Sequence, residues 1–317
     1  MDLPTIEPLP IVRVANVKPV LPTERWLATG LWAHHAVGIV GGSPKSGKTW
    51  LALDLAVAVA SGRPCLGRFR VEKPGPVLLF AAEDSPSDVR ERVRNIAAAR
   101  GTDLDRLPLG LVTEIGFRLD SLDYQRRLRV TLDRVRPRLL VLDPLVRLHR
   151  GDENSAADVS DLLGFLRCLQ REFDLAVCLV HHIRKSAAAH PGQALRGSGD
   201  LHAWTDSGLY LLRQKDGCVL HIEHRANPSP PPLRLALQSD PTRLEVTGPV
   251  QEPDDAPPGS VEARVVEVLA KGPATRSDLR DRLRVRNESL GLALRSLEVR
   301  GAIALRNGHW AVPVPAP

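Results

Sequence analysis

Residues 42–49 carry the phosphate-binding pattern G-x-x-x-x-G-K-T, as Gly-Ser-Pro-Lys-Ser-Gly-Lys-Thr. The apolar run Ala36–Val40 before the motif predicts a buried strand, and the apolar stretch Trp50–Ala60 after it predicts a helix. A strand, a glycine-rich loop and a helix are the context that this motif requires, whereas a chance Gly-Lys-Thr in a surface turn would lack both flanks. The motif therefore restricts the chain to folds in which a buried strand ends at a nucleotide-binding loop.

The residue types of the loop predict Mg²⁺ and ATP as its ligands. Glycine lets backbone N–H groups approach phosphate oxygens, and the N-terminus of the following helix adds positive potential. Lys48 can reach the β- and γ-phosphates, and the hydroxyl of Thr49 can ligate Mg²⁺. The residues expected to bind the nucleotide are Gly42, Ser43, Pro44, Lys45, Ser46, Gly47, Lys48, Thr49 and Trp50.

The overall composition limits the classes of protein to consider. The chain has 317 residues, which is enough for one large and one small domain or for two medium domains. Its net charge of +6 permits nucleic-acid binding, but 4% aromatic residues argue against base-stacking platforms. The chain has neither an apolar run long enough to cross a membrane nor an apolar signal-peptide block, and its four cysteines show no zinc or disulfide spacing. A cytoplasmic protein without membrane contact is expected.

Apolar strand-like runs alternate with helix-like stretches between residues 36 and 212. The expected strands are Ala36–Val40, Pro76–Ala81, Leu139–Leu142, Leu175–Val180 and Gly208–Leu212, and the expected helices are Lys48–Ala60, Ser85–Ala99, Tyr124–Val135 and Ala156–Arg171. This alternation predicts an α/β fold with a mostly parallel sheet and helices on both faces. Three short runs between residues 218 and 246 are expected to extend the sheet with antiparallel strands.

The domain boundaries follow from shifts in composition. Residues 1–24 are expected to form an irregular arm, residues 25–246 the ATPase domain and residues 247–260 a linker rich in proline, glycine and acidic residues. Within residues 261–313, three helices are expected at 261–270, 276–283 and 287–300, followed by a hairpin around Asn307-Gly308. Three helices and a hairpin predict a small winged helix-turn-helix domain.

Two further strands end in carboxylates that suit ATP hydrolysis. Arg138–Asp143 is an apolar strand that ends in aspartate, the Walker B pattern, so Asp143 is expected to hold Mg²⁺ directly or through water. The next residue is Pro144, so a glutamate directly after the Walker B aspartate is absent. Glu83, at the end of another core strand, is therefore the expected residue that orients or deprotonates the attacking water. Asp84 is expected to be the N-cap of the following helix.

His181 and His182 close the strand at 175–180, beside the strand of Asp143. His182 is a candidate sensor of the γ-phosphate, and metal binding by the pair is the alternative. Arg196 follows a small polar loop after this strand, where it suits an arginine finger that inserts into the ATP site of a neighbouring subunit. Arg213, at the end of the next strand, is the competing candidate for the finger.

Five motifs in this order resemble the RecA-like ATPases of the RepA type, which include hexameric replicative helicases of some plasmids. The motifs are Gly-Gly-Ser-Pro-Lys-Ser-Gly-Lys-Thr, Ala-Ala-Glu-Asp, Leu-Asp-Pro-Leu, His-His-x-Arg-Lys and Arg-Gly-Ser, and the resemblance covers about residues 30 to 212. The resemblance implies a RecA-like core, a ring-shaped homo-oligomer, Glu83 as the catalytic carboxylate, His182 as the sensor and Arg196 as the finger acting in trans. A winged-helix tail is not part of the helicase pattern.

Residues 261–317 hold most of the excess positive charge of the chain, with ten Lys or Arg against six Asp or Glu. The candidates for contacts with DNA phosphates lie before, along and after the third expected helix and in the hairpin, namely Arg284, Arg286, Arg295, Arg300 and Arg306. DNA is therefore the expected partner, and a winged helix that contacts another protein is the alternative.

The sequence thus predicts an Mg²⁺-ATP-dependent RecA-like motor that assembles, as a hexameric ring, on DNA during replication of a plasmid or mobile element. Two alternatives stay open. One is a regulatory switch whose ATP state controls binding of DNA or a partner through the winged helix, and the other is a filament-forming recombinase.

Overall fold

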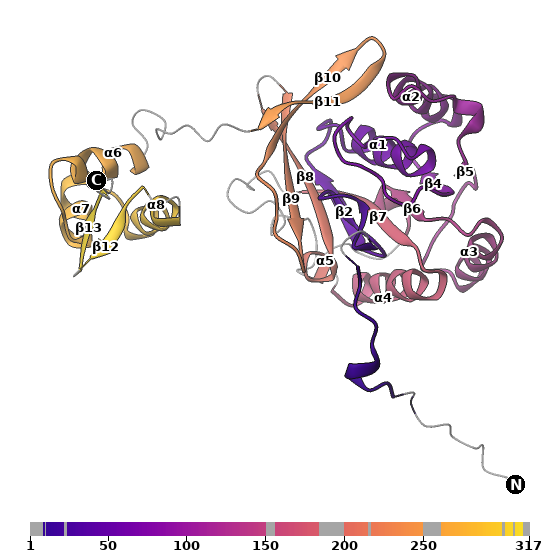
Figure 1. Ribbon diagram of the computed structural model, residues 1–317, viewed down its shortest axis with the longest axis horizontal. Coiled ribbons are helices and arrows are strands. Elements are labelled where there is room, and N and C mark those ends of the chain that lie inside the picture. Colours follow the sequence, from indigo (N-terminus) through magenta and orange to yellow (C-terminus); the bar gives the residue numbers. More distant parts are fainter. Residues whose placement is uncertain are drawn as a thin grey trace, which may run out of the picture. The chain divides into compact units, whose positions relative to one another are not determined.

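The computed structural model of the chain describes residues 9, 11–21, 24–149, 156–183, 200–214, 217–249, 261–299, 302–306 and 308–312. The chain forms two compact units, Met1–Val250 and Gln251–Pro317 (Figure 1). Among the described helices, none has both the length and the apolar character that a membrane crossing needs.

The larger unit is built on a nine-stranded sheet in the order β11-β10-β9-β8-β3-β7-β6-β4-β5. Six neighbouring strands are parallel, namely β8 (Ser207–Gln214), β3 (Val37–Gly42), β7 (Ala176–His182), β6 (Leu139–Asp143), β4 (Val77–Ala81) and β5 (Leu109–Val112). Three antiparallel strands extend the β8 side, namely β9 (Gly217–His224), β10 (Leu233–Ser239) and β11 (Thr242–Pro249). The predicted α/β fold with a mostly parallel sheet is confirmed.

Helices cover both faces of this sheet (Figure 1). Helices α1 (Lys48–Ser61) and α2 (Pro86–Ala99) pack on one face, and α3 (Leu122–Val135), α4 (Ala156–Phe173) and α5 (Asp200–Trp204) pack on the other. Successive side chains of a strand point to opposite faces, so Val141 joins the core under α1 while Leu140 and Leu142 join the core under α4. Both faces are therefore apolar, and the parallel strands appear in the sequence as continuous hydrophobic runs.

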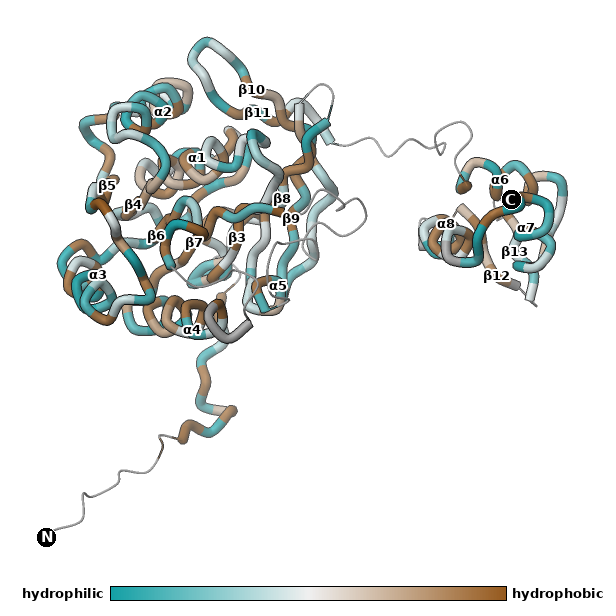
Figure 2. Tube along the Cα trace, turned by 180° about the vertical axis from the view of Figure 1, so that it is seen from behind, coloured by the Kyte–Doolittle hydropathy of each residue, from teal (hydrophilic) through white to brown (hydrophobic). Residues whose placement is uncertain are grey.

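Helix α1 is apolar around most of its circumference (Figure 2). It contacts the sheet on one side and both α2 and β11 on the other, so little of its surface meets water. A helix that is apolar all round is buried in this way. The helix that begins with the lysine and threonine of the phosphate-binding motif is thus held rigidly in the middle of the unit.

Several elements were not expected from the sequence. The short pair β1 (Trp26–Ala28) and β2 (Trp32–Ala33) forms a separate two-stranded sheet, and β5 forms the edge of the large sheet.

Trp32 is buried against β3, where a Cβ atom on Gly38 would lie 2.7 Å from the indole ring and 2.0 Å from the carbonyl oxygen of Ser207. Only glycine fits such a close approach. Strand β11 also continues to Pro249, past the expected end of the core at residue 246.

A buried ion pair ties α1, α2 and β11 together. Arg100, the C-cap residue of α2, pairs with Asp54 of α1 at 2.6 Å and also donates to the carbonyl oxygen of Leu244 at 3.4 Å. The Asp54 side chain is fully buried, and its Oδ1 accepts from the backbone N–H of Leu66 at 2.6 Å. Burial raises the pKa of Asp54, and the guanidinium opposes that rise. The guanidinium of Arg100 therefore stabilises the charged form of the buried Asp54 carboxylate.

We expect Arg100→Met to lower the free energy of unfolding by about 3–5 kcal/mol, because it leaves a buried carboxylate without its cation. Urea unfolding of the full chain, followed by circular dichroism, measures this loss. Arg136→Met is the matched control, since it removes an exposed pair with Asp133 and should cost at most about 1 kcal/mol. Equal losses in the two variants would contradict the assigned role of the buried pair.

The smaller unit has its own core. It contains α6 (Val261–Ala270), α7 (Arg276–Leu283), α8 (Asn287–Val299) and the antiparallel pair β12 (Ala304–Arg306) and β13 (His309–Ala311). Leucines from the three helices pack around Ile303 and Trp310. Helix α7 begins with a capping box between Thr275 and Asp278. These elements follow the expected order, and their assignment as a winged helix stays a prediction.

Candidate nucleotide-binding site

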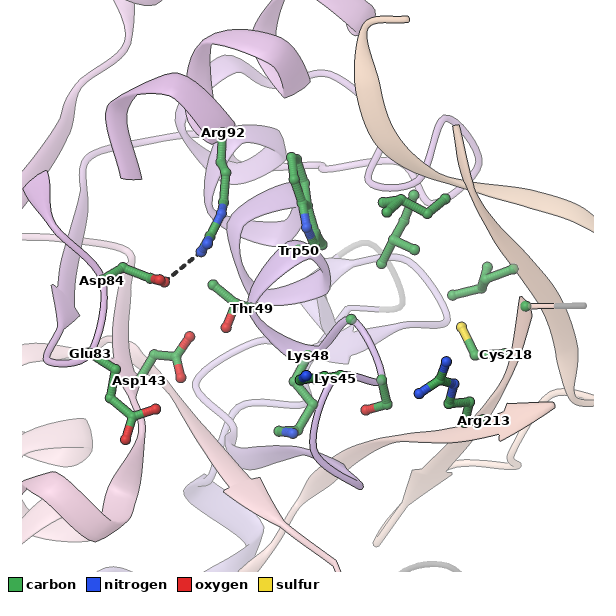
Figure 3. A pocket seen from close by; sticks show the side chains of 16 residues that line it. Lys45, Lys48, Thr49, Trp50, Glu83, Asp84, Arg92, Asp143, Arg213 and Cys218 are labelled. Atoms are coloured by element: carbon green, nitrogen blue, oxygen red, sulfur yellow. Dashed lines mark hydrogen bonds and ion pairs between the residues drawn. The ribbon is translucent and has the colours of Figure 1, made fainter. Parts of the chain in front are cut away.

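A pocket of about 470 Å³ lies where β3, β6 and β4 end (Figure 3). The loop after β3 contributes Lys45–Trp50, the end of β6 contributes Asp143, and the segment after β4 contributes Glu83 and Asp84. These segments converge because carboxyl ends of parallel strands meet at the same edge of a sheet, where ligands bind in open α/β folds. The structure thus brings Lys48, Thr49, Glu83 and Asp143 into one pocket.

The loop after β3 has a shape suited to phosphate. Gly47 adopts a left-handed conformation with φ of 91° as the N-cap residue of α1, which directs the first backbone N–H groups of the helix to the pocket. The ammonium of Lys48 donates to the carbonyl oxygen of Ser43 at 2.9 Å, across the loop. The Ser46 hydroxyl is buried and has no hydrogen-bond partner among the described residues. Unsatisfied donors and a buried cation fit an anionic ligand.

The side chains of Asp143 and Thr49 both line the pocket and lie near each other (Figure 3). Burial raises the pKa of Asp143 to about 6, and the neighbouring carboxylates of Asp84 and Glu83 add to this rise against the effects of Thr49 and Lys48. Burial also lowers the pKa of Lys48, although Asp143 and Glu83 oppose that shift. Oxygen ligands beside clustered carboxylates suit Mg²⁺, so Thr49 and Asp143 are the residues that would hold the ion.

Strand pairing explains why Glu83 reaches the pocket. Ala81 lies opposite Asp143 in the parallel β4–β6 pair, and the backbone N–H of Ala82 donates to the carbonyl oxygen of Asp143 at 2.8 Å. The chain then turns away from the sheet and presents Glu83 beside Asp143. The Glu83 carboxylate accepts a hydrogen bond from the guanidinium of Arg147 at 2.9 Å.

The expectation that Asp84 caps α2 is wrong. The helix begins at Pro86, and its N-cap is Ser85, whose hydroxyl accepts from the backbone N–H of Asp88 at 3.1 Å. The N-cap position directly precedes the first helical residue, so Asp84 lies one position too early. Its side chain instead pairs with Arg92 of α2 and lines the pocket (Figure 3).

The other candidate residues lie at different places. His182 ends β7 opposite Gly42, where the next backbone N–H, that of Ile183, donates to the Gly42 carbonyl oxygen at 3.3 Å. His182 is thus next to the start of the phosphate-binding loop, although it does not line the pocket. Arg213, near the end of β8, lines the pocket of its own chain. Arg196 lies outside the described residues, and so does the loop before it.

The apolar side of the pocket was missed in the sequence. Leu235, Leu237 and Leu244 of the β10–β11 hairpin form this wall, together with Cys218 at the start of β9. A Cβ atom on Gly47 would lie 3.7 Å from the methyl groups of Leu244, so the hairpin reaches the phosphate-binding loop itself. The short runs at 233–237 and 243–246 did predict strands here, but they carry no signal that the hairpin folds over α1.

The pocket is therefore acidic at one end, and leucines line the other end together with Arg213. Figure 3 shows Glu83, Asp84 and Asp143 on one side of Lys48, and Arg213 and Cys218 on the opposite side. A nucleoside triphosphate has the same polarity, with charge at its phosphates and an apolar ring at its base. Trp50 lies half-buried at the rim, where the Arg92 guanidinium is 5.9 Å from the centre of its ring.

Of the DNA-contact candidates in the smaller unit, Arg284, Arg286 and Arg295 are exposed, and none pairs with a described acidic side chain. Arg300 and the side chain of Arg306 lie outside the described residues. Arg276 and Arg280, which the sequence did not single out, line a hollow of about 370 Å³ with Ser277 and Asn287.

No group of three or more His, Cys, Asp or Glu side chains in the described ranges is placed to bind a metal ion.

Comparisons with known proteins show the fold and the family of the chain. The fold is similar to that of a KaiC-like protein from the hyperthermophilic archaeon Pyrococcus horikoshii, with a TM-score of 0.50 and 16% sequence identity over 73% of this chain and 97% of that chain. A family model described as an AAA domain matches residues 3–188, from the N-terminal arm through the phosphate-binding loop, Glu83, Asp143 and His182. The chain therefore belongs to the AAA domain family, and it is a RecA-like P-loop ATPase.

Proposed function

We propose that the protein hydrolyses ATP as a ring-shaped motor on DNA and is a RepA-like replicative helicase of a plasmid or mobile element. The convergence of Lys48, Thr49, Asp143 and Glu83 in one pocket supports the ATPase step most directly. Asp143 ends β6, Lys48 and Thr49 begin α1, and Glu83 lies two residues past the end of β4, so each side chain is on or close to a rigid element.

Each side chain of the pocket has a role in this proposal. Lys48 and the backbone N–H groups around Gly47 bind the phosphates, and Arg213 adds a second positive charge from β8. Bound Mg²⁺ would neutralise charge on the β- and γ-phosphates, held by Thr49 and Asp143. Glu83 orients the attacking water or accepts its proton, and His182 senses the γ-phosphate through its contact with the loop strand. The leucine wall holds the base.

A neighbouring subunit completes the proposed site. Arg196 follows β7, whose neighbour β3 carries the phosphate-binding loop, and we assign it as the arginine finger of the adjacent subunit in a hexameric ring. Arg213 is less suited to act in trans, because it already lines the pocket of its own chain. The assignment predicts that ATP is hydrolysed at subunit interfaces.

The smaller unit is proposed as a winged-helix module that binds DNA. Its exposed arginines at the start of α8 and along it are placed to neutralise phosphates, which is the sequence-independent part of DNA affinity. The arginines around the hollow between α7 and α8 add to this positive surface. The ATPase unit would then supply force, and the smaller unit would supply attachment.

The proposed function is tested by measuring ATP hydrolysis with and without DNA, together with separation of a forked duplex. We expect DNA-stimulated turnover coupled to strand separation, and Lys48→Ala should abolish both. Slow turnover that DNA does not change would favour the regulatory switch. Filaments in place of closed rings, seen by electron microscopy with an ATP analogue, would favour a recombinase.

Deleting residues 250–317 should weaken DNA binding and flatten its dependence on salt, because arginines that release counterions are lost. Reversing charge in Arg286→Glu and Arg295→Glu should do the same, with each lost phosphate contact lowering the salt slope by about 0.9 for duplex DNA. Arg106→Glu, an exposed arginine of the larger unit, is the matched control. An unchanged slope after truncation would move the DNA site to the ATPase unit.

A further inference from the structure

An ion pair on the proposed catalytic carboxylate is not explained by the proposed function. Arg147 is the last residue of the 3-10 turn η4 (Leu145–Arg147), which begins two residues after Asp143. Its Nε donates to Oε1 of Glu83 at 2.9 Å, and the two side chains are 58% and 49% exposed. One oxygen of the carboxylate that must meet the attacking water is therefore engaged by a cation.

The backbone around Arg147 is firmly held. Leu145 and Leu148 on either side are buried in the core, with 1% and 0% exposure. The carbonyl oxygen of Arg147 accepts from the Arg118 guanidinium at 2.6 Å, and the Leu148 carbonyl oxygen accepts from the backbone N–H of Leu119 at 2.6 Å. The Arg147 side chain thus projects from a fixed position beside Glu83.

The pair lies between two hollows. Glu83 and Asp84 line the nucleotide pocket, and they also line a second cavity of about 740 Å³. Arg147 and Arg118 line this second cavity and are not among the residues of the nucleotide pocket. Figure 3 shows the Asp143 carboxylate directed toward Thr49 and the Glu83 carboxylate directed away from it. Arg147 therefore holds Glu83 on the side of the second cavity.

We propose that Arg147 is a positioning residue that restrains Glu83, and that the Glu83–Arg147 pair opens before water is activated. The inference rests on the proposed function of Glu83. The Glu83 carboxylate is directed away from Thr49, so it must turn toward the nucleotide to meet the attacking water (Figure 3). An exposed pair is weak enough to open in each cycle, since its strength corresponds to at most about a fivefold change in rate.

Arg147→Ala should therefore raise kcat for ATP, without DNA, by roughly 1.5- to 5-fold. KM and the affinity for a non-hydrolysable analogue should stay unchanged, because Arg147 does not line the nucleotide pocket. Arg147→Lys keeps a cation beside Glu83 and should behave as the unaltered protein. Arg127→Ala is the matched control, since it removes an exposed arginine–glutamate pair, with Glu114, at the same cavity.

A double variant separates this inference from the proposed function. Adding Arg147→Ala to Glu83→Gln should give no increase in single-turnover rate if Arg147 acts through Glu83. A lower kcat in Arg147→Ala, an equal gain in Arg127→Ala, or a gain that persists with Glu83→Gln would overturn the restraint. Full activity of Glu83→Gln alone would instead refute the proposed role of Glu83.

Discussion

Glu83→Gln is expected to lower ATP turnover by about 10²- to 10⁴-fold, the usual contribution of a positioned general base. The amide has nearly the same size but does not accept the proton of the attacking water. Affinity for ATP should be nearly unchanged, because the phosphate contacts come from the loop around Lys48. Steady-state hydrolysis and binding of a fluorescent ATP analogue, measured on the same preparation, test the two parts separately.

Asp84→Asn is the natural control for this substitution. Asp84 is the neighbouring carboxylate, lines the same pocket and pairs with Arg92 rather than with Arg147. Its neutralisation should change turnover far less than that of Glu83, since its charge is already committed to α2. A severe loss in Asp84→Asn with normal turnover in Glu83→Gln would transfer the role of base to Asp84.

The sequence predicted the core strands of the large sheet because their signals are local. A strand buried on both faces needs a continuous run of apolar residues, so Leu139–Leu142 and Leu175–Val180 were recognisable before any contact was known. Edge strand β5 is only partly buried, and its apolar stretch has four residues and contains a glycine. The pair β1 and β2 was missed for a similar reason, since each strand has three residues or fewer.

In the candidate site too, residues in local motifs were predictable and residues brought together by long-range packing were not. Lys48, Thr49 and Asp143 were predictable because each is tied to the end of a strand by a short motif, and parallel strands bring such ends together. The leucine wall and Arg147 depend on packing between segments that are far apart in the chain. Leu244 reaches the phosphate-binding loop through the fold of the hairpin over α1, and Arg147 meets Glu83 across 64 positions of sequence. No local pattern encodes either contact.

Arg196→Ala is expected to lower ATP turnover by about 10³-fold or more while nucleotide binding stays nearly intact. A finger in trans contributes little to ground-state binding, because it stabilises charge that develops on the phosphates during hydrolysis. Arg213→Ala is a useful comparison, since Arg213 lines the pocket of its own chain and its loss should also weaken binding. Measuring the rate of ATP hydrolysis and the affinity for a non-hydrolysable ATP analogue in both variants distinguishes a residue that acts only in hydrolysis from one that also binds the nucleotide.

Mixing subunits decides whether Arg196 acts across an interface. In a mixture of Arg196→Ala and Lys48→Ala subunits, some interfaces combine an intact phosphate-binding loop with an intact finger, so part of the activity should return. A mixture of Arg213→Ala and Lys48→Ala subunits should stay inactive, because every pocket then lacks one of two residues that belong to the same chain. Recovery in the second mixture but not in the first would make Arg213 the finger, and no recovery in either would place both arginines in cis.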